Sequence, residues 1–291
     1  MTLELLRWYQ AMGVDEAIAD EPLDWSQYAP PALPVVESAS VQPSPGRDAP
    51  TAQQAPARNV PRQSPSAPAA IARATPTAAP DASVMAARGL AREAPDLEAL
   101  HTVLTTFDGC PLKKTAKNLC FARGAPNARL MLIGEAPGRD EDLQGEPFVG
   151  RAGRLLDRML AAIGFGGGEA YITNVVYWRP PGNRTPTPQE VLACQPFLER
   201  QIELVAPDVL VLLGGAAAKQ VLATDTGIMK LRGKWKSYNA GGRTIRTMAT
   251  LHPAYLLRSP AAKRQAWRDL LMVKAALAEV EAGTGTGSGD G

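Results

Sequence analysis

The chain has 291 residues, of which 45% are hydrophobic, so it can bury one fair-sized core. Its 31 basic and 29 acidic residues leave a formal net charge of +2, so any contact with nucleic acid must come from local basic clusters. No run of about 20 apolar residues is present to span a bilayer, and the acids in MTLELLRWYQAMGVDE argue against a secretory signal. We therefore expect a cytoplasmic protein without a membrane contact.

The ends of the chain differ in composition from its middle. Residues 1–28 include an amphipathic pattern from Thr2 to Ile18, which predicts a helix that binds an unknown protein. Residues 29–82 are rich in Ala and Pro and almost free of large apolar side chains. Such a segment cannot offset its ordering entropy, so we expect a disordered linker. Residues 282–291 predict a flexible, Gly-rich tail.

Residues 83–281 have an ordinary globular composition in which helical and strand-like patterns alternate. The predicted helices are Ser83 to Glu93, Asp96 to Thr106, Ala152 to Ile163 and Gln189 to Leu204. The predicted strands are Arg129 to Ile133, Ala170 to Val176, Val209 to Leu213 and Thr244 to Ala249. The alternation predicts a three-layer α/β/α sandwich with a four-stranded parallel sheet. Ligands bind such sheets outside the carboxyl ends of the strands, where we look for a site.

The turn after the first strand reads GEAPGRDEDLQGEPFVGRAG, from Gly134 to Gly153. Its glycines let backbone amides approach a ligand closely, and Phe148 offers a flat apolar face to a planar ring. The same residues are also explained by a tight turn with solvated acids and a Phe148 in the core.

Polar residues follow two other strands. Asn174 lies near the end of the second strand, and its amide can read a nucleobase edge or cap a turn. His252 lies in TLHPAYLLRSP after the last strand, as a ligand-facing or a structural histidine. His101 lies in a helical stretch and predicts no function. Gly214 and Gly215 do not fit phosphate-loop spacing, which disfavours nucleotide chemistry.

Three long motifs, GEAPGRDED with PFVGRAG, ITNVV with RPPGNRTP, and LHPAYLLR, resemble the motif series of family 4 uracil-DNA glycosylases. Their order and spacing match from roughly Thr106 to Trp267. The resemblance implies a monomeric, nucleoid-associated hydrolase for base excision repair. It would cleave the N-glycosidic bond of flipped-out deoxyuridine in single- or double-stranded DNA, releasing uracil and leaving an abasic site.

The resemblance also implies roles for individual residues. Phe148 would stack on uracil, Asn174 would hydrogen-bond its polar edge, and backbone amides near Gly134 and Glu135 would hold a carbonyl. His252 would stabilise the charge that develops at uracil O2.

A carboxylate near the sugar would position water. Glu141 fits that role best by motif position, with Glu135 as the reserve, and Glu141 or its loop is also a candidate to crowd the methyl group of thymine. Leu256, Leu257 and Arg258 are placed to supply the wedge that replaces a flipped base. Other basic side chains are candidates for phosphate contacts, although each alone is also explained as solvated surface: Arg151, Arg179, Arg184, Lys263 and Arg264.

The cysteines depart from the family pattern. Many family 4 enzymes hold a four-iron four-sulfur cluster with four cysteines, but here Phe107 and Trp178 stand at two of those positions, leaving Cys110 and Cys194. Two thiolates cannot hold a cluster that needs four ligands, and Cys120 is not at a matching position. We predict no cluster and no other metal, with Phe107 and Trp178 filling the volume as a small apolar core.

Two alternatives remain at the level of sequence. The same fold is compatible with a shifted base preference, and the chain is compatible with a catalytically weak DNA-binding or polymerase-associated module. The joint presence of Glu141, Asn174, Phe148 and His252 favours catalysis. The loop WRPPGNRTP contains no histidine, so we expect simple hydrolysis without a covalent intermediate.

Overall fold

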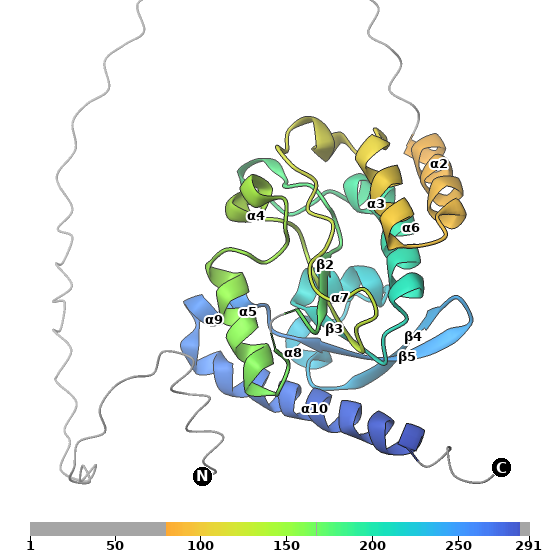
Figure 1. The fold of residues 1–291 in the computed structure, drawn as a ribbon. Coiled ribbons are helices and arrows are strands. Elements are labelled where there is room, and N and C mark those ends of the chain that lie inside the picture. Colours follow the sequence, from red (N-terminus) through yellow and green to blue (C-terminus); the bar gives the residue numbers. More distant parts are fainter. Residues whose placement is uncertain (1–79, 167, 286–291) are drawn as a thin grey trace, which may run out of the picture. The chain divides into compact units, whose positions relative to one another are not determined.

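The computed structural model describes residues 80–166 and 168–285, and their side chains from residue 83 to residue 281 (Figure 1). The predicted N-terminal helix and most of the predicted linker lie outside the described residues. The α-helices are α2 (Pro80–Glu93), α3 (Leu97–Thr106), α4 (Arg139–Gln144), α5 (Arg151–Ala162), α6 (Pro188–Val205), α7 (Gly215–Val221), α8 (Ile228–Leu231), α9 (Pro253–Arg258) and α10 (Lys263–Gly285). Short 3-10 helices are η1 (Pro111–Lys114), η2 (Pro181–Asn183) and η3 (Pro260–Ala262).

Local sequence signals explain where the predicted helices begin. The Asp96 carboxylate accepts the backbone N–H of Ala99 at 2.8 Å and caps α3. At α6, Thr187 and Glu190 form a reciprocal capping box ahead of Pro188 in the first helical position. All four predicted helices are confirmed, with small shifts at their ends.

The sheet has five strands in the order β2-β1-β3-β5-β4. The strands are β1 (Leu130–Gly134), β2 (Tyr171–Asn174), β3 (Val209–Leu213), β4 (Trp235–Ala240) and β5 (Arg243–Thr250). The four predicted strands are confirmed and run parallel. The prediction missed β4, an antiparallel edge strand that reaches β5 through Gly241 and Gly242, both with positive φ. Most of β4 is solvent-accessible, so it lacks the apolar run that marks the buried strands.

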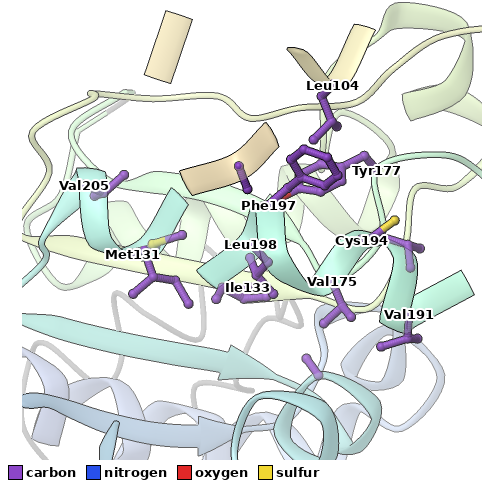
Figure 2. Packing of buried hydrophobic residues seen from close by; sticks show 14 of the residues in the cluster. Leu104, Met131, Ile133, Val175, Tyr177, Val191, Cys194, Phe197, Leu198 and Val205 are labelled. Atoms are coloured by element: carbon purple, nitrogen blue, oxygen red, sulfur yellow. The ribbon is translucent and has the colours of Figure 1, made fainter. Parts of the chain in front are cut away.

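Helices cover both faces of the sheet (Figure 1). Alternating residues of the central strands belong to two different buried clusters. Met131 and Ile133 of β1 pack in a buried cluster with α2, α3, α6 and α7. Figure 2 shows both side chains on the strand, with Leu198 of α6 next to them. Leu130 and Leu132 pack in a second cluster with α5, α9 and α10. The period-two alternation therefore builds the predicted three layers.

Two segments differ from their predicted state. The stretch from Gly134 to Gly153, predicted as a turn, contains the short helix α4. Helix α10 continues to Gly285, into the segment predicted as a tail. Among the helices of residues 80–166 and 168–285, we find none with the length and apolarity needed to cross a membrane.

Candidate active site

A cleft of about 460 Å³ opens at the carboxyl ends of the parallel strands. Its walls come from the segments that follow β1, β3 and β5, and from the loop between β2 and α6. The residues that line it include Glu135, Arg184, Thr185, Gly214, His252 and Arg258. This is the edge at which doubly wound sheets bind ligands, as the sequence predicted.

Gly134, Asn174 and Phe148 meet at the ends of β1 and β2. A Cβ atom built on Gly134 would lie 2.4 Å from Asn174 Oδ1 and 2.5 Å from Phe148 Cζ, so only glycine leaves this space free. Asn174 is 1% exposed, and its Oδ1 atom is buried without a hydrogen-bond donor. The Asn174 oxygen therefore does not cap a turn, and a buried acceptor without a donor is costly unless a ligand supplies one.

Phe148 has an unusual backbone conformation beside the cleft. Its φ of 57° is rare for a bulky residue, and its ring is almost fully buried. The backbone carbonyl of Phe148 leaves room for no side chain at Gly153, because a Cβ there would lie 1.6 Å from the carbonyl oxygen. The Phe148 and His252 rings stack with centroids 5.6 Å apart. Phe148 is thus both a core residue and a neighbour of the cleft histidine.

Glu141 connects the two helices that flank the Phe148 loop. Its Oε2 atom accepts the backbone N–H of Gly138 at 3.1 Å, at the start of α4. Its Oε1 atom accepts the N–H of Gly150 at 2.9 Å, at the start of α5. The carboxylate is therefore engaged with two helix N-termini, where negative charge is stabilised, and it is not part of the cleft wall.

His252 is the N-cap residue of α9 and lies in the cleft wall. Its Nδ1 atom accepts the backbone N–H of Ala254 at 3.1 Å, so the proton of the neutral ring sits on Nε2. Burial and the nearby charge of Arg258 lower the pKa of His252 to about 4. The ring is therefore a neutral hydrogen-bond donor through Nε2 at neutral pH.

Glu135 is the acid that the structure places in the cleft wall. Burial raises the pKa of its carboxyl group, and a hydrogen bond from Thr185 partly opposes that shift. Sequence reasoning missed Thr185, because a single threonine in a Pro-rich loop carries no signal of its own.

The structure corrects one part of the predicted DNA wedge. Leu256 is completely buried in the cluster of α5, α9 and α10, so it cannot insert into a base stack. Leu257 is 38% exposed and Arg258 is exposed in the cleft wall. Tyr255, which sequence reasoning missed, is 40% exposed and also lines the cleft.

The predicted basic contacts differ in their surroundings. Arg184 lines the cleft, and its guanidinium donates to both carboxylate oxygens of Glu190 at 2.6 and 2.8 Å. Arg179 donates to Asn183 at 2.7 Å. Lys263 is buried, which argues against a phosphate contact, whereas its neighbour Arg264 is exposed.

The cysteine pair lies in an apolar environment that does not fit an iron–sulfur cluster. Phe107 and Trp178 are buried as predicted, and the Phe107 ring packs edge-on against Phe197 at 4.9 Å. Cys110 and Cys194 are buried thiols with their sulfur atoms 3.8 Å apart. Figure 2 shows Cys194 near the aromatic group that includes Phe197. In the described part of the chain, no three His, Cys, Asp or Glu side chains are grouped to hold a metal ion.

Comparison with known proteins agrees with this geometry. The family model described as the uracil DNA glycosylase superfamily matches residues 121–271. The chain is 44% identical to the type-4 uracil-DNA glycosylase of Archaeoglobus fulgidus over 160 residues, covering 54% of this chain and 80% of that protein. It is 40% identical to the type-4 uracil-DNA glycosylase of Pyrobaculum aerophilum over 182 residues, covering 60% and 92%. The type-5 enzyme of the latter organism is 32% identical over 148 residues, covering 46% and 64%.

The matched region includes β1, β2, β3 and β5 and every residue placed above in the cleft. The motifs that carried the resemblance thus lie at one edge of one sheet. This chain belongs to the uracil-DNA glycosylase superfamily.

Proposed function

We propose that this protein excises uracil from DNA by hydrolysing the N-glycosidic bond of a flipped-out deoxyuridine. The observation that carries the proposal is the buried Asn174 Oδ1 atom, which accepts no hydrogen bond beside the cleft. Uracil presents an N3–H donor that would satisfy this acceptor, whereas cytosine presents an acceptor at N3 and would leave it unpaired. The Phe148 ring next to Asn174 supplies a face for the base.

His252 would stabilise the leaving base. As the bond from C1′ to N1 breaks, negative charge spreads from N1 to O2 of uracil, and a fixed N–H donor there lowers the barrier. The Nε2–H of His252 is such a donor, because its Nδ1 atom is held by Ala254. The low pKa of about 4 keeps the ring neutral, so it donates without transferring its proton.

Glu135 is our candidate for the acid that positions water. Its carboxylate would accept a proton from water as the water oxygen bonds to C1′, and the uracil anion would leave and take up a proton at N1. Its place in the cleft and its raised pKa support this role. Glu141 was preferred by motif position, but two backbone N–H groups already occupy its carboxylate.

DNA would be held at the rim of the cleft. Tyr255 and Leu257 expose apolar surface on α9 and are our candidates for the wedge. Arg258 would meet a phosphate, and Arg184 would reach one only while sharing its charge with Glu190. The monomeric state, a cytoplasmic and nucleoid-associated location, and a protein partner for residues 1–28 also stay proposals.

We further propose that the enzyme works without an iron–sulfur cluster. The support is the donor set: Phe107 and Trp178 contribute apolar rings where the family pattern has thiolates. No step of the reaction above passes through a metal.

The proposal is tested with the full-length protein on labelled oligonucleotides carrying one uracil, hypoxanthine or thymine, both single-stranded and paired, followed by alkaline cleavage. We expect strand cleavage at uracil alone. Cleavage at hypoxanthine but not at uracil would replace the proposal with a shifted base preference, and binding without cleavage would support a DNA-binding module.

A further inference from the structure

A buried acid of α10 takes no part in the reaction proposed for the cleft. Asp269 of α10 is 1% exposed. Its Oδ1 atom accepts a hydrogen bond from the Arg232 guanidinium at 2.5 Å, and its Oδ2 atom accepts the hydroxyl proton of Thr250 at 2.6 Å. Burying a carboxylate is costly even when it is paired, so a well-packed apolar residue would serve stability as well. The presence of a carboxylate at this position is better explained by what its hydrogen bonds hold in place.

Thr250 is the last residue of β5 and stands two residues before His252. Its backbone oxygen accepts the N–H of Gly214 at 2.8 Å, at the end of β3. Gly214 in turn approaches His252 so closely that an added Cβ would lie 3.0 Å from the His252 Cβ. The strand end that carries His252 is therefore held by β3 through its backbone and by α10 through the Thr250 hydroxyl.

The Asp269 network also reaches the turn after α8. Arg232 donates to the backbone oxygen of Gln265 at 2.7 Å, which fixes the guanidinium on α10. Gly233, with φ 65°, lies so close that an added Cβ would be 2.7 Å from Asp269 Oδ1. Its N–H donates to the Ala249 oxygen of β5 at 3.1 Å. Three segments thus converge on the last two residues of β5.

We propose that Asp269 and Thr250 are positioning residues that aim the His252 ring at the leaving base. The proposal rests on the proposed uracil excision. The described hydrogen bond of the His252 ring, from Ala254, lies within its own turn, so apart from the stacked Phe148 ring the direction of the ring depends on where the strand ends. A misplacement of about 1 Å at a catalytic group can cost on the order of a hundred-fold in rate.

The test compares Thr250→Val, Thr250→Ser and Asp269→Asn in the full-length protein by steady-state kinetics on a uracil-containing oligonucleotide. Thr247→Val is the matched control, because Thr247 is equally buried on β5 and donates only to the Ile245 oxygen of its own strand. We expect Thr250→Val and Asp269→Asn to lower kcat for uracil release by on the order of ten-fold without raising KM. Thr250→Ser keeps the hydroxyl and should restore the rate.

A second arm repeats Thr250→Val in a His252→Ala background. If Thr250 acts through His252, the substitution has no further effect there. An equal loss in both backgrounds, a rise in KM alone, or unchanged kcat in an active enzyme overturns the positioning role and leaves the proposed function standing. A wild-type protein that binds DNA but releases no uracil overturns both.

Discussion

Asn174 illustrates how a single buried atom indicates a ligand. Its oxygen sits beneath Gly134 and the Phe148 ring without a donor, although a buried acceptor normally has one. A folded chain keeps such an atom where a ligand supplies the donor, at some cost in stability to the free protein.

The absence of a side chain at Gly134 should be essential for the space between Asn174 and the Phe148 ring. In Gly134→Ala, the methyl group would meet Asn174 Oδ1 at 2.4 Å and the Phe148 ring at 2.5 Å. We expect uracil release to fall by about a hundred-fold and stability to fall by about 1–3 kcal/mol from overpacking. The measurements are single-turnover rate and thermal unfolding.

Gly227→Ala is the control for Gly134→Ala. No heavy atom lies within 4 Å of its added Cβ, and its φ of −66° suits alanine. A Gly134→Ala enzyme as active as Gly227→Ala would show that the space beside Asn174 does not hold the base.

The low pKa of His252 makes a prediction about stability. Below its ordinary pKa of 6.5 the unfolded histidine takes up a proton, whereas the folded one stays neutral down to about pH 4. Protons therefore favour the unfolded state in this window, so stability is lost as pH falls from 6.5 toward 4. Between pH 7 and pH 5 the wild type should lose about 2 kcal/mol more than His252→Gln. Urea unfolding at both pH values measures this, and parallel losses would contradict it.

Two acids of the segment that follows β1, Glu135 and Glu141, have different surroundings. Glu141 joins the starts of α4 and α5, while Glu135 follows β1 into the cleft. The same motif thus contains one acid, Glu141, that joins two helix starts and one, Glu135, that lines the cleft.

Substitution of Glu135 and of Glu141 by glutamine should affect kcat and stability differently. Glu135→Gln keeps the shape of the side chain but removes the base, so we expect kcat to fall by about 10²–10⁴-fold. We expect unchanged or higher stability, because burial already penalises the charged form of Glu135. Glu141→Gln cannot accept both backbone N–H groups and should lower the unfolding temperature with a smaller loss of kcat. The reverse pattern would return the water-positioning role to Glu141.

A strand can be predicted from the sequence when its burial requires a run of apolar residues. The four parallel strands and the capped helices were predicted, since buried strands are apolar runs and α6 carries a capping box. Strand β4 was missed because most of its side chains are solvent-accessible, unlike those of β2 at the other edge of the sheet. Leu256 was assigned wrongly to the wedge, because a helix as short as α9 does not reveal which of two adjacent leucines faces inward. The pairing of Glu141 with Gly150 depends on tertiary structure alone.

At the level of the whole molecule, apolar aromatic rings stand at two of the four positions where the resemblance implies cysteines. Phe107 and Trp178 join the same buried cluster as Cys110 and Cys194, together with side chains of α2, α3 and α6. Burial of two large aromatic rings contributes to stability without a metal.

We therefore expect purified full-length protein, prepared without oxygen, to contain no stoichiometric iron and no broad visible absorption. Iron analysis and an absorption spectrum are the measurements, with activity after treatment with an iron chelator as a second readout. About four iron atoms per active chain, lost together with activity on chelation, would contradict the apolar replacement of the cluster.

We propose that Asn174 binds uracil and His252 promotes its release, and single-turnover excision from a labelled single-stranded oligonucleotide tests both roles together. Asn239→Ala and His101→Ala, at an exposed asparagine and the other histidine, are matched controls. We predict uracil release by the wild type and both controls, and losses of about a hundred-fold or more in Asn174→Ala and His252→Ala with retained folding. A wild type that releases no uracil, or full activity in both pocket variants, would rule out these roles for Asn174 and His252.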